Sequence, residues 1–315
     1  MDTPLFPKFA FLDGRVVPWE EAHVPISTHA LLYGTGCYEG IRGYWNKEKN
    51  KMFIFRGREH FQRLQNSCRI MFIKCEYTIE DLLSIIKNLI LKNQFQEDVY
   101  IRPVAYKKLS PTIIGPALHT ASDGFFMIIF PQEPTRQPEG IHLGTSSWRR
   151  LKDTTIPPRG KICGNYVNTG LAKTEAVLCG YDDCLFLTEE GYISEAGTSN
   201  LLIIRGGVLI TPPPYMDILE GITLDTVLSL AKDIALPISI RPLHRTELFV
   251  AEEVFVCGTA SEIVAVTRVD HRTIGDGKPG QITRRLQNEF RKIVEAKNEK
   301  YLSWLEPVRG KDKES

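Results

Sequence analysis

Lys161 lies between two glycines in the segment RGKICG (residues 159–164), directly before a predicted helix. A lysine in such a tight, backbone-rich turn is held away from a solvated face, and burial favours the uncharged amine over the ammonium. A free amine can attack an aldehyde and form a Schiff base with it. The segment is also compatible with an ordinary basic residue at the end of a loop, so by itself it only makes Lys161 a candidate nucleophile.

Glu195 lies at the end of a predicted strand in YISEAGTSNLL (residues 192–202), where small residues and a second strand follow it. A carboxylate in this position can pair with the protonated nitrogen of a pyridine ring, which keeps the ring cationic and able to accept electrons. The alternative is an exposed glutamate in a turn. The chemistry of Glu195 therefore complements that of Lys161.

Two more segments offer groups that bind anions. In LEGITLD (residues 219–225), Gly221 and Thr223 open a predicted helix and offer backbone N–H groups, a hydroxyl and the positive end of the helix. In CGTASEI (residues 257–263), a predicted strand ends in small residues whose backbone N–H groups can bind an anion. The first segment can also be a plain helix cap and the second a plain turn. Both are candidate phosphate-binding segments.

The elements that must position these segments are predicted from periodicity and turn residues. Helices are expected where apolar residues recur at three- and four-residue spacing, at 59–72, 79–92, 166–179, 224–233 and 282–296. Strands are expected at 8–12, 52–55, 99–105, 125–130, 141–146, 184–188, 200–204, 208–211, 238–241 and 254–256. Turn signals at 13–14, 189–191 and 205–207 predict antiparallel hairpins. The sequence therefore predicts an α+β protein whose sheets are not purely parallel.

A proline-rich connection, PQEPTRQPEG (residues 131–140), separates two strand-like runs. Its composition is typical of a stiff, solvated linker. We expect a smaller N-terminal α/β domain at 1–133, a linker at 134–140 and a larger C-terminal domain at 141–315. The last residues, RGKDKES, are expected to fray.

Composition excludes several classes of protein. The 315 residues are 43% hydrophobic and 24% charged with a formal charge of +1, so no global field would attract nucleic acid. The N-terminus lacks a signal-peptide pattern and no stretch is apolar enough to span a membrane, which predicts a cytoplasmic protein. The seven cysteines are never spaced C-x-x-C, so neither a disulfide framework nor a metal site is expected.

The four segments, in this order and at these intervals, resemble the fold-type IV enzymes that use pyridoxal 5'-phosphate (PLP). They are most similar to the class IV aminotransferases, which include branched-chain amino acid aminotransferase. The resemblance extends to YGTGCYEGIR (residues 33–42), FRGREHFQRL (55–64), YIRP (100–103) and SSWRR (146–150), and it covers residues 8 to 300 or so. It implies a two-domain fold with PLP in the cleft between the domains.

The resemblance also implies roles around the cofactor. Lys161 would form the Schiff base and move protons, Glu195 would pair with the pyridine nitrogen, and Tyr166 would hydrogen-bond the side of the ring that carries the 3-hydroxyl. Leu219 would pack against the ring. The phosphate would be bound by a set of groups from different segments, namely Arg58, the Ile222 N–H, Thr223 and Thr259.

Substrate binding is implied at a second group of residues. Tyr100 and the backbone of Thr259 and Ala260 would bind the substrate carboxylate, with Arg102 nearby. Tyr38 would line the side-chain pocket. Tyr33 would reach in from a partner subunit, so a homodimer or larger homo-oligomer is expected.

The reaction implied is a ping-pong transamination of L-leucine, L-isoleucine and L-valine with 2-oxoglutarate. Three alternatives stay open: a D-amino acid or (R)-amine transaminase, a PLP lyase similar to aminodeoxychorismate lyase, and a protein that has lost activity. The family commonly has an aromatic residue where this chain has Gln132. Gln132 and residues 107–116 would shape the substrate pocket, so the choice of substrate is less well defined by the sequence than the type of reaction. His29 is expected to be a structural hydrogen-bonding residue.

Overall fold

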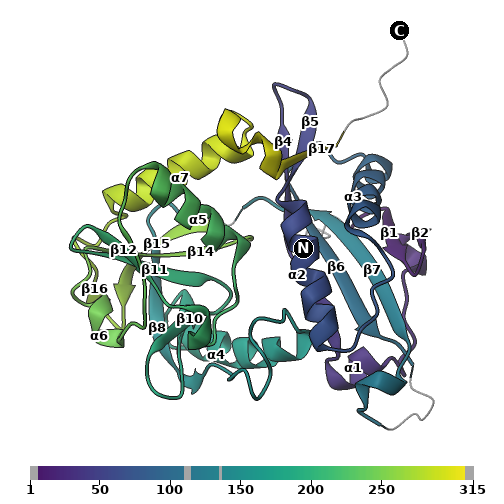
Figure 1. Ribbon diagram of the computed structural model, residues 1–315, viewed down its shortest axis with the longest axis horizontal. Coiled ribbons are helices and arrows are strands. Elements are labelled where there is room, and N and C mark those ends of the chain that lie inside the picture. Colours follow the sequence, from purple (N-terminus) through teal and green to yellow (C-terminus); the bar gives the residue numbers. More distant parts are fainter. Residues whose placement is uncertain (1–5, 110–114, 135–136, 309–315) are drawn as a thin grey trace. The chain divides into compact units, whose positions relative to one another are not determined.

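A computed structural model describes residues 6–109, 115–134 and 137–308, and it divides the chain into two compact units (Figure 1). Unit 1 contains the described residues within Met1–Glu133, Gly160–Gly164 and Ile293–Ser315. Unit 2 contains those within Pro134–Arg159 and Asn165–Lys292. The short segment that carries Lys161 therefore belongs to the unit formed by the N-terminal part of the chain. Residues 135 and 136 of the predicted linker, and the predicted frayed tail, lie outside the described residues.

Unit 1 is built on one antiparallel sheet. Its strands are β1 (Phe9–Leu12), β2 (Arg15–Pro18), β3 (Gly36–Tyr38), β4 (Ile41–Asn46), β5 (Lys51–Phe55), β6 (Val99–Lys107), β7 (Asp123–Pro131) and β17 (Leu305–Val308). They are ordered β17-β5-β4-β6-β7-β1-β2, and β3 pairs with β6. Asp13 and Gly14 join β1 to β2 with φ of 44° and 95°, which only turn-forming residues adopt readily, and this confirms the predicted hairpin.

Two long helices pack against each other and against this sheet (Figure 1). The helices of unit 1 are α1 (His29–Tyr33), α2 (Gly57–Ile70) and α3 (Ile79–Asn93). α3 begins with a capping box in which Asp81 N donates to Thr78 Oγ1 and Thr78 N donates to Asp81 Oδ2. α2 buries Phe61, Leu64 and Cys68 on one face, as the apolar spacing predicts.

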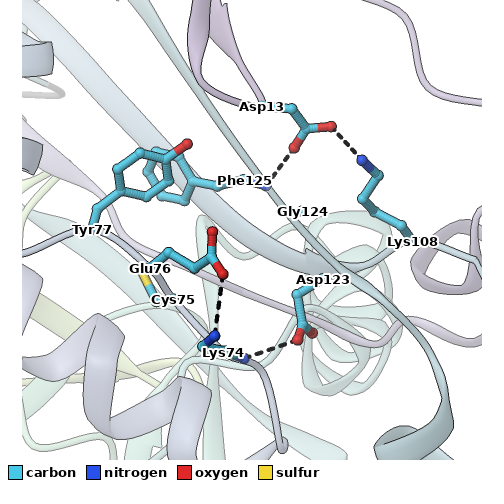
Figure 2. Close-up of a pocket in the computed structure, with 9 residues that line it drawn as sticks. All are labelled: Asp13, Lys74, Cys75, Glu76, Tyr77, Lys108, Asp123, Gly124 and Phe125. Carbon is cyan, nitrogen blue, oxygen red and sulfur yellow. Dashed lines mark hydrogen bonds and ion pairs between the residues drawn. The ribbon is translucent and has the colours of Figure 1, made fainter.

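Figure 2 shows a pocket of about 280 Å³ between β1, β7 and the segment that precedes α3. Its charged groups pair with one another: Lys108 Nζ lies 2.8 Å from Asp13 Oδ2, and Lys74 Nζ lies 3.3 Å from Glu76 Oε1. Phe125 N also donates to Asp13 Oδ1. Among the residues that line it, only Lys108 lies in a segment that the sequence links to substrate choice, residues 107–116.

Unit 2 is built on one mixed sheet. Its strands are β8 (Ile141–Arg149), β9 (Asp183–Leu187), β10 (Ile193–Ala196), β11 (Asn200–Arg205), β12 (Val208–Thr211), β13 (Ile238–Ile240), β14 (Glu253–Gly258), β15 (Glu262–Val269) and β16 (Arg272–Thr273). They are ordered β10-β9-β8-β15-β14-β11-β12-β13, and β16 pairs with β15. β8 runs parallel to β9 and β15, whereas β11 and β14 are antiparallel, which confirms that the sheet is not purely parallel.

Helices α4 (Tyr166–Leu178) and α5 (Ile222–Asp233) pack on this sheet, α4 against β8 and β9 and α5 against β13 and β14. The remaining helices are α6 (Arg245–Leu248), α7 (Gln281–Val294) and the short 3-10 helices η1 (Trp19–Glu21), η2 (Leu118–Thr120), η3 (Cys163–Asn165), η4 (Pro214–Met216) and η5 (Glu299–Trp304). None of the helices in the described ranges is long and apolar enough to cross a bilayer.

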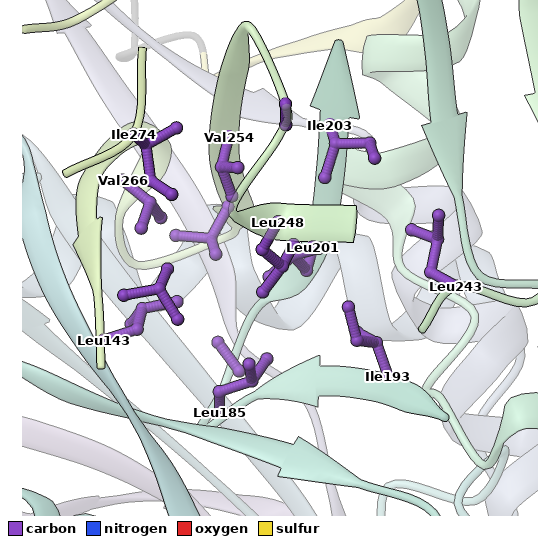
Figure 3. Close-up of a cluster of buried hydrophobic side chains, with 14 of the residues drawn as sticks. Leu143, Leu185, Ile193, Leu201, Ile203, Leu243, Leu248, Val254, Val266 and Ile274 are labelled. Carbon is purple, nitrogen blue, oxygen red and sulfur yellow. The ribbon is translucent and has the colours of Figure 1, made fainter. Parts of the chain in front are cut away.

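The core of unit 2 fixes the strand that carries Glu195 (Figure 3). Ile193 and Ala196 of β10 both lie in this core with Leu185 of β9, although strict alternation would point them to opposite faces. The pairing of β10 with β9 shifts register between Ile193 and Ala196, so the extra residue of a β-bulge breaks the alternation. Such bulges re-aim a side chain, and here the bulge lies beside Glu195.

Candidate active site

The backbone of Lys161 is held on both sides by unit 1. Tyr38 N donates to Lys161 O over 3.0 Å, and Lys161 N donates to Ser67 Oγ over 3.0 Å. The next residue, Ile162, forms an antiparallel bridge with Cys37 of β3. The half-buried Lys161 side chain therefore starts from a defined position along β3 rather than from a free loop.

Close backbone contact with the lysine segment explains the glycine at position 34. Gly164 N donates to Gly34 O over 3.1 Å, and a Cβ on Gly34 would lie 3.0 Å from Gly164 Cα. Gly34 also has a φ of 70°, which side-chain-bearing residues rarely adopt. Gly34 is therefore needed to let residues 160–164 approach the chain before β3.

The Lys161 amine belongs to a cluster of cations and phenol rings. Lys161 Nζ lies 5.0 Å from the centroid of the Tyr38 ring, and the Arg102 guanidinium carbon lies 4.2 Å from the same centroid. Arg102 Nη2 donates to Tyr100 Oη over 3.3 Å. Arg102 Nε is buried and has no hydrogen-bond partner among the residues that the structure describes. An unpaired buried donor is costly, so this atom indicates a place for an acceptor such as a substrate carboxylate.

Gly40 gives Tyr100 its position. A Cβ on Gly40 would collide with Tyr100 Oη, so only glycine lets the phenol lie against the backbone there. Unit 1 thus brings together four of the residues that the sequence assigned to the site: Lys161, Tyr38, Tyr100 and Arg102.

A buried ion cluster lies on α2 near the lysine. Arg63 Nε and Nη2 donate to the two oxygens of Glu39 over 2.7 and 2.8 Å, and His60 Nδ1 lies 2.8 Å from Glu39 Oε2. Burial alone would raise the pKa of Glu39, but Arg63 and His60 hold it well below its usual range. Burial lowers the pKa of His60, and the charges of Arg63 and Lys161 lower it further.

The surroundings of Arg58 do not support its predicted role. Its side chain is 51% exposed and donates to Glu80 Oε1 and Glu306 Oε1 over 2.7 and 3.0 Å. Arg63 of the same helix is 12% exposed and belongs to the cluster that feels the charge of Lys161. Because two glutamates hold Arg58 at an exposed position, Arg63 is the better-placed arginine for a buried phosphate.

Glu195 is bound from three directions in unit 2. Arg150 Nη2 lies 2.7 Å from Glu195 Oε1, and Asn200 Nδ2 and Leu219 N each donate to Oε2 over 3.2 Å. The Glu195 side chain is 5% exposed. It is therefore a buried, charge-compensated carboxylate and not an exposed turn glutamate.

Asn200 connects the segment before α5 to the Glu195 carboxylate. Asn200 Nδ2 also donates to Leu219 O over 2.9 Å, and a Cβ on Gly221 would collide with Asn200 Oδ1. Gly221 is the N-cap of α5, and Thr223 in the first turn is 4% exposed. The N–H groups at a helix start can bind a phosphate, so the geometry here fits the predicted role.

Other predicted site residues occupy turns or helix ends. Thr259 and Ala260 lie half-buried in the turn between β14 and β15, and Tyr166 is the first residue of α4. Tyr33 ends α1 and is 41% exposed. The structural role predicted for His29 is confirmed, because its ring nitrogens lie 2.6 Å from Thr35 Oγ1 and 3.1 Å from Gly115 O.

The segment around Gln132, which is expected to shape the substrate pocket, is hydrogen-bonded to a buried arginine. Arg42, which is 1% exposed, donates from Nη1 to Gln132 O and from Nη2 to Glu133 O. The other segment, residues 107–116, is described only in part, since 110–114 lie outside the described residues.

Comparison with known proteins decides the family. The family model for amino-transferase class IV matches residues 36–269. The chain belongs to the class IV aminotransferases. It is 42% identical over 307 residues to a probable branched-chain-amino-acid aminotransferase of Aquifex aeolicus, an alignment that covers 96% of this chain and 97% of that protein.

Solved structures agree with this assignment of the aminotransferase. A branched-chain amino acid aminotransferase from Thermobaculum terrenum in its PLP form matches with a TM-score of 0.92 and 36% identity, over 97% of this chain and 99% of that one. One from Thermoproteus uzoniensis, solved with norvaline, matches with a TM-score of 0.91 and 39% identity, over 96% and 100%. A third, complexed with N-(5'-phosphopyridoxyl)-L-glutamate, matches with a TM-score of 0.91 and 34% identity, over 96% and 99%. The predicted α+β fold of this family is thereby confirmed.

Sequence reasoning missed several buried partners in this aminotransferase. Glu39, Arg63 and Arg150 each lie inside a segment that carried the family resemblance, namely residues 33–42, 55–64 and 146–150. Each is a charged residue that the structure buries in a pair with another charge. The signal that could have identified them is a charged residue inside a segment that carries the family resemblance.

Proposed function

We propose that this aminotransferase uses PLP to transaminate L-branched-chain amino acids with 2-oxoglutarate by a ping-pong mechanism. The observation that carries the proposal is the cluster around Tyr38, whose ring lies near both the Lys161 amine and the Arg102 guanidinium, and in which the buried Arg102 Nε has no acceptor among the described residues. An amino acid offers the matching carboxylate. The relatives named for branched-chain substrates support the substrate class.

Bound PLP supplies an aldehyde and a ring that accepts electrons. Lys161 Nζ would attach the cofactor, and its free amine would accept the proton of the substrate Cα and donate it again. Glu195 would pair with the protonated ring nitrogen. Tyr166 would hydrogen-bond the side of the ring that carries the 3-hydroxyl, and Leu219 would pack against the ring.

The phosphate is assigned to the groups at the start of α5 and to the β14–β15 turn. These are the Ile222 N–H, Thr223 and Thr259. We propose Arg63 as the arginine of this set in place of Arg58, because the Arg63 side chain is only 12% exposed and both it and Lys161 act on the buried His60, whereas Arg58 forms an exposed pair with two glutamates. A guanidinium fork suits phosphate oxygens.

The substrate carboxylate is assigned to Arg102, Tyr100 and the Thr259–Ala260 backbone, and Tyr38 lines the side-chain pocket. The surroundings of Tyr100 are partly aromatic, since its ring centroid lies 5.6 Å from that of Phe130. An aliphatic amino acid suits such surroundings. The related enzyme that was solved with a phosphopyridoxyl-glutamate supports glutamate and 2-oxoglutarate as the second pair.

We also propose a homodimer in which Tyr33 contributes to the site of the second copy. Leu31, Leu32 and Tyr33 on α1 are 64%, 50% and 41% exposed, which is an apolar surface suited to burial against another subunit. The described cysteines are free thiols, which supports a reducing compartment such as the cytoplasm.

Parallel assays test the substrate assignment. L-leucine, L-isoleucine and L-valine are each offered with 2-oxoglutarate, beside D-alanine and (R)-1-phenylethylamine. We expect glutamate formation from the three L-amino acids at far higher kcat/KM than from the other donors. Preference for D-alanine or the (R)-amine would contradict the substrate assignment, and pyruvate release without any 2-oxo acid acceptor would indicate a lyase.

A further inference from the structure

Arg150 is itself fixed by unit 2 before it meets Glu195. Its Nε and Nη1 donate to Asp217 O and Thr169 Oγ1, both over 3.4 Å. Its guanidinium carbon lies 5.4 Å from the centroid of the buried Phe186 ring. With a side chain only 7% exposed, Arg150 is a rigid buried cation and not a mobile surface one.

The ion pair with Glu195 is correspondingly well defined. Arg150 Nη2 lies 2.7 Å from Glu195 Oε1, while the other oxygen accepts from Asn200 and from the Leu219 N–H. A charge-assisted bond this short, shielded from solvent, strongly favours the ionised carboxylate. Arg150 therefore does two things: it fixes the position of the Glu195 carboxylate, and it makes that carboxylate less ready to take up a proton.

A proton between a ring nitrogen and a carboxylate resides on the stronger base. A cation beside the carboxylate makes it the weaker base, because protonation would cost the ion pair. We propose that Arg150 is a positioning residue that keeps Glu195 ionised and thereby keeps the proton on the cofactor ring nitrogen. This inference rests on the proposed function and adds a residue to it.

A purely structural role of Arg150 predicts a different result. If Arg150 only neutralises a buried carboxylate for folding, its replacement lowers stability but leaves the state of the ring nitrogen unchanged in protein that has folded. The decisive readout is therefore the ¹⁵N chemical shift of the ring nitrogen in protein loaded with ¹⁵N-labelled PLP, which reports protonation at that atom.

The experiment compares Arg150→Gln with Arg149→Gln as a matched control. Arg149 is the preceding residue, its side chain is exposed, and its Nη1 donates to the Ser146 carbonyl over 3.3 Å. We expect Arg150→Gln to move the ¹⁵N shift toward the unprotonated ring and to lower kcat by roughly 10- to 100-fold, the range seen when a supporting partner is removed. Arg149→Gln and Arg150→Lys, which keeps the charge, should stay near the wild-type shift.

A folded Arg150→Gln protein with the wild-type shift and kcat would overturn the proposal. If Arg150→Gln does not fold with PLP present, Arg150→His replaces it. Its imidazole is charged only at low pH, so kcat and the ¹⁵N shift should recover as pH falls through the imidazole titration. Absence of that additional titration would overturn the proposal. Failure of the wild-type protein to bind PLP would instead refute the proposed function itself.

Discussion

Lys161 Nζ lies 5.0 Å from the centroid of the Tyr38 ring, and the backbone oxygen of Lys161 accepts a hydrogen bond from Tyr38 N. The Arg102 guanidinium carbon lies 4.2 Å from that centroid. One ring therefore contacts both the amine that would react and the guanidinium that would bind the substrate carboxylate. The ring is the common support for the two functional groups.

Replacing Tyr38 by leucine should lower kcat/KM for L-leucine by about fivefold or more. Loss of the ring removes stacking on Arg102, an interaction of about 1 kcal/mol at a partly desolvated position. Tyr38→Phe keeps the ring and should stay within about twofold of wild type by the same reasoning. Steady-state kinetics distinguishes the two variants, and equal losses would show that the hydroxyl, not the ring, carries the effect.

Gly40→Ala should raise KM for the amino donor by about tenfold or more. The added Cβ collides with Tyr100 Oη, and displacing a packed group costs about 1–3 kcal/mol. Gly170→Ala is the matched control, because a Cβ there meets no atom within 4 Å and alanine favours the α4 helix. A Gly40→Ala enzyme with unchanged KM would contradict the assignment of Tyr100 to the substrate carboxylate.

Glu39→Gln should destabilise the protein by about 3–5 kcal/mol, since it leaves the Arg63 charge without its buried partner. Urea denaturation measures the loss. Glu80→Gln, which removes a carboxylate from the exposed pair with Arg58, should leave the urea midpoint unchanged. Similar midpoints for the two variants would refute the importance of the Glu39 cluster.

Stability should fall as pH drops from 7 to 5. The folded-state pKa of His60 is lowered, so its contribution is fully present above the unfolded value of about 6.5 and is lost below it. The lowered pKa of Glu39 adds a second loss below about 4.3, the value for an unfolded glutamate.

His60→Gln should flatten the pH dependence between 7 and 5, because one titrating group is removed. The exposed His119 provides the control, and His119→Gln should keep the wild-type slope. Free energies of unfolding from urea titrations at each pH test this. A His60→Gln slope equal to that of wild type would assign the acid sensitivity to another group.

Local patterns were sufficient for much of the fold. The apolar spacing of α3 and the capping pair Thr78–Asp81 are contained in one short stretch, so the helix could be located from it. Strand β4, with Gly43 in its interior, and strand β15, which begins at Glu262 with a φ of 59°, were not predicted. Each pairs with one strand nearby in the sequence, β5 or β14, and with one far away, β6 or β8, and no local signal marks the distant pairing.

The candidate site shows the same limit. Arg58 and Arg63 both lie on α2, and the sequence does not tell which one is buried. Glu39 selects Arg63, while Glu80 and Glu306 bind Arg58. Similarly, the role of Arg150 follows from its ion pair with Glu195, which lies 45 positions further along the chain. Long-range charge pairing thus determines roles that motifs alone leave open.

The central claim is that Lys161 attaches the cofactor, and reduction followed by peptide mapping tests it most directly. Purified protein incubated with PLP should show an absorbance band in the visible range, and borohydride reduction should leave a phosphopyridoxyl mass on the peptide that contains Lys161. Lys161→Ala should lose the band, the mass and transamination, whereas Lys74→Ala, at an exposed lysine paired with Glu76, should keep all three. A Lys161→Ala protein with normal turnover, or the label on another lysine, would contradict the account.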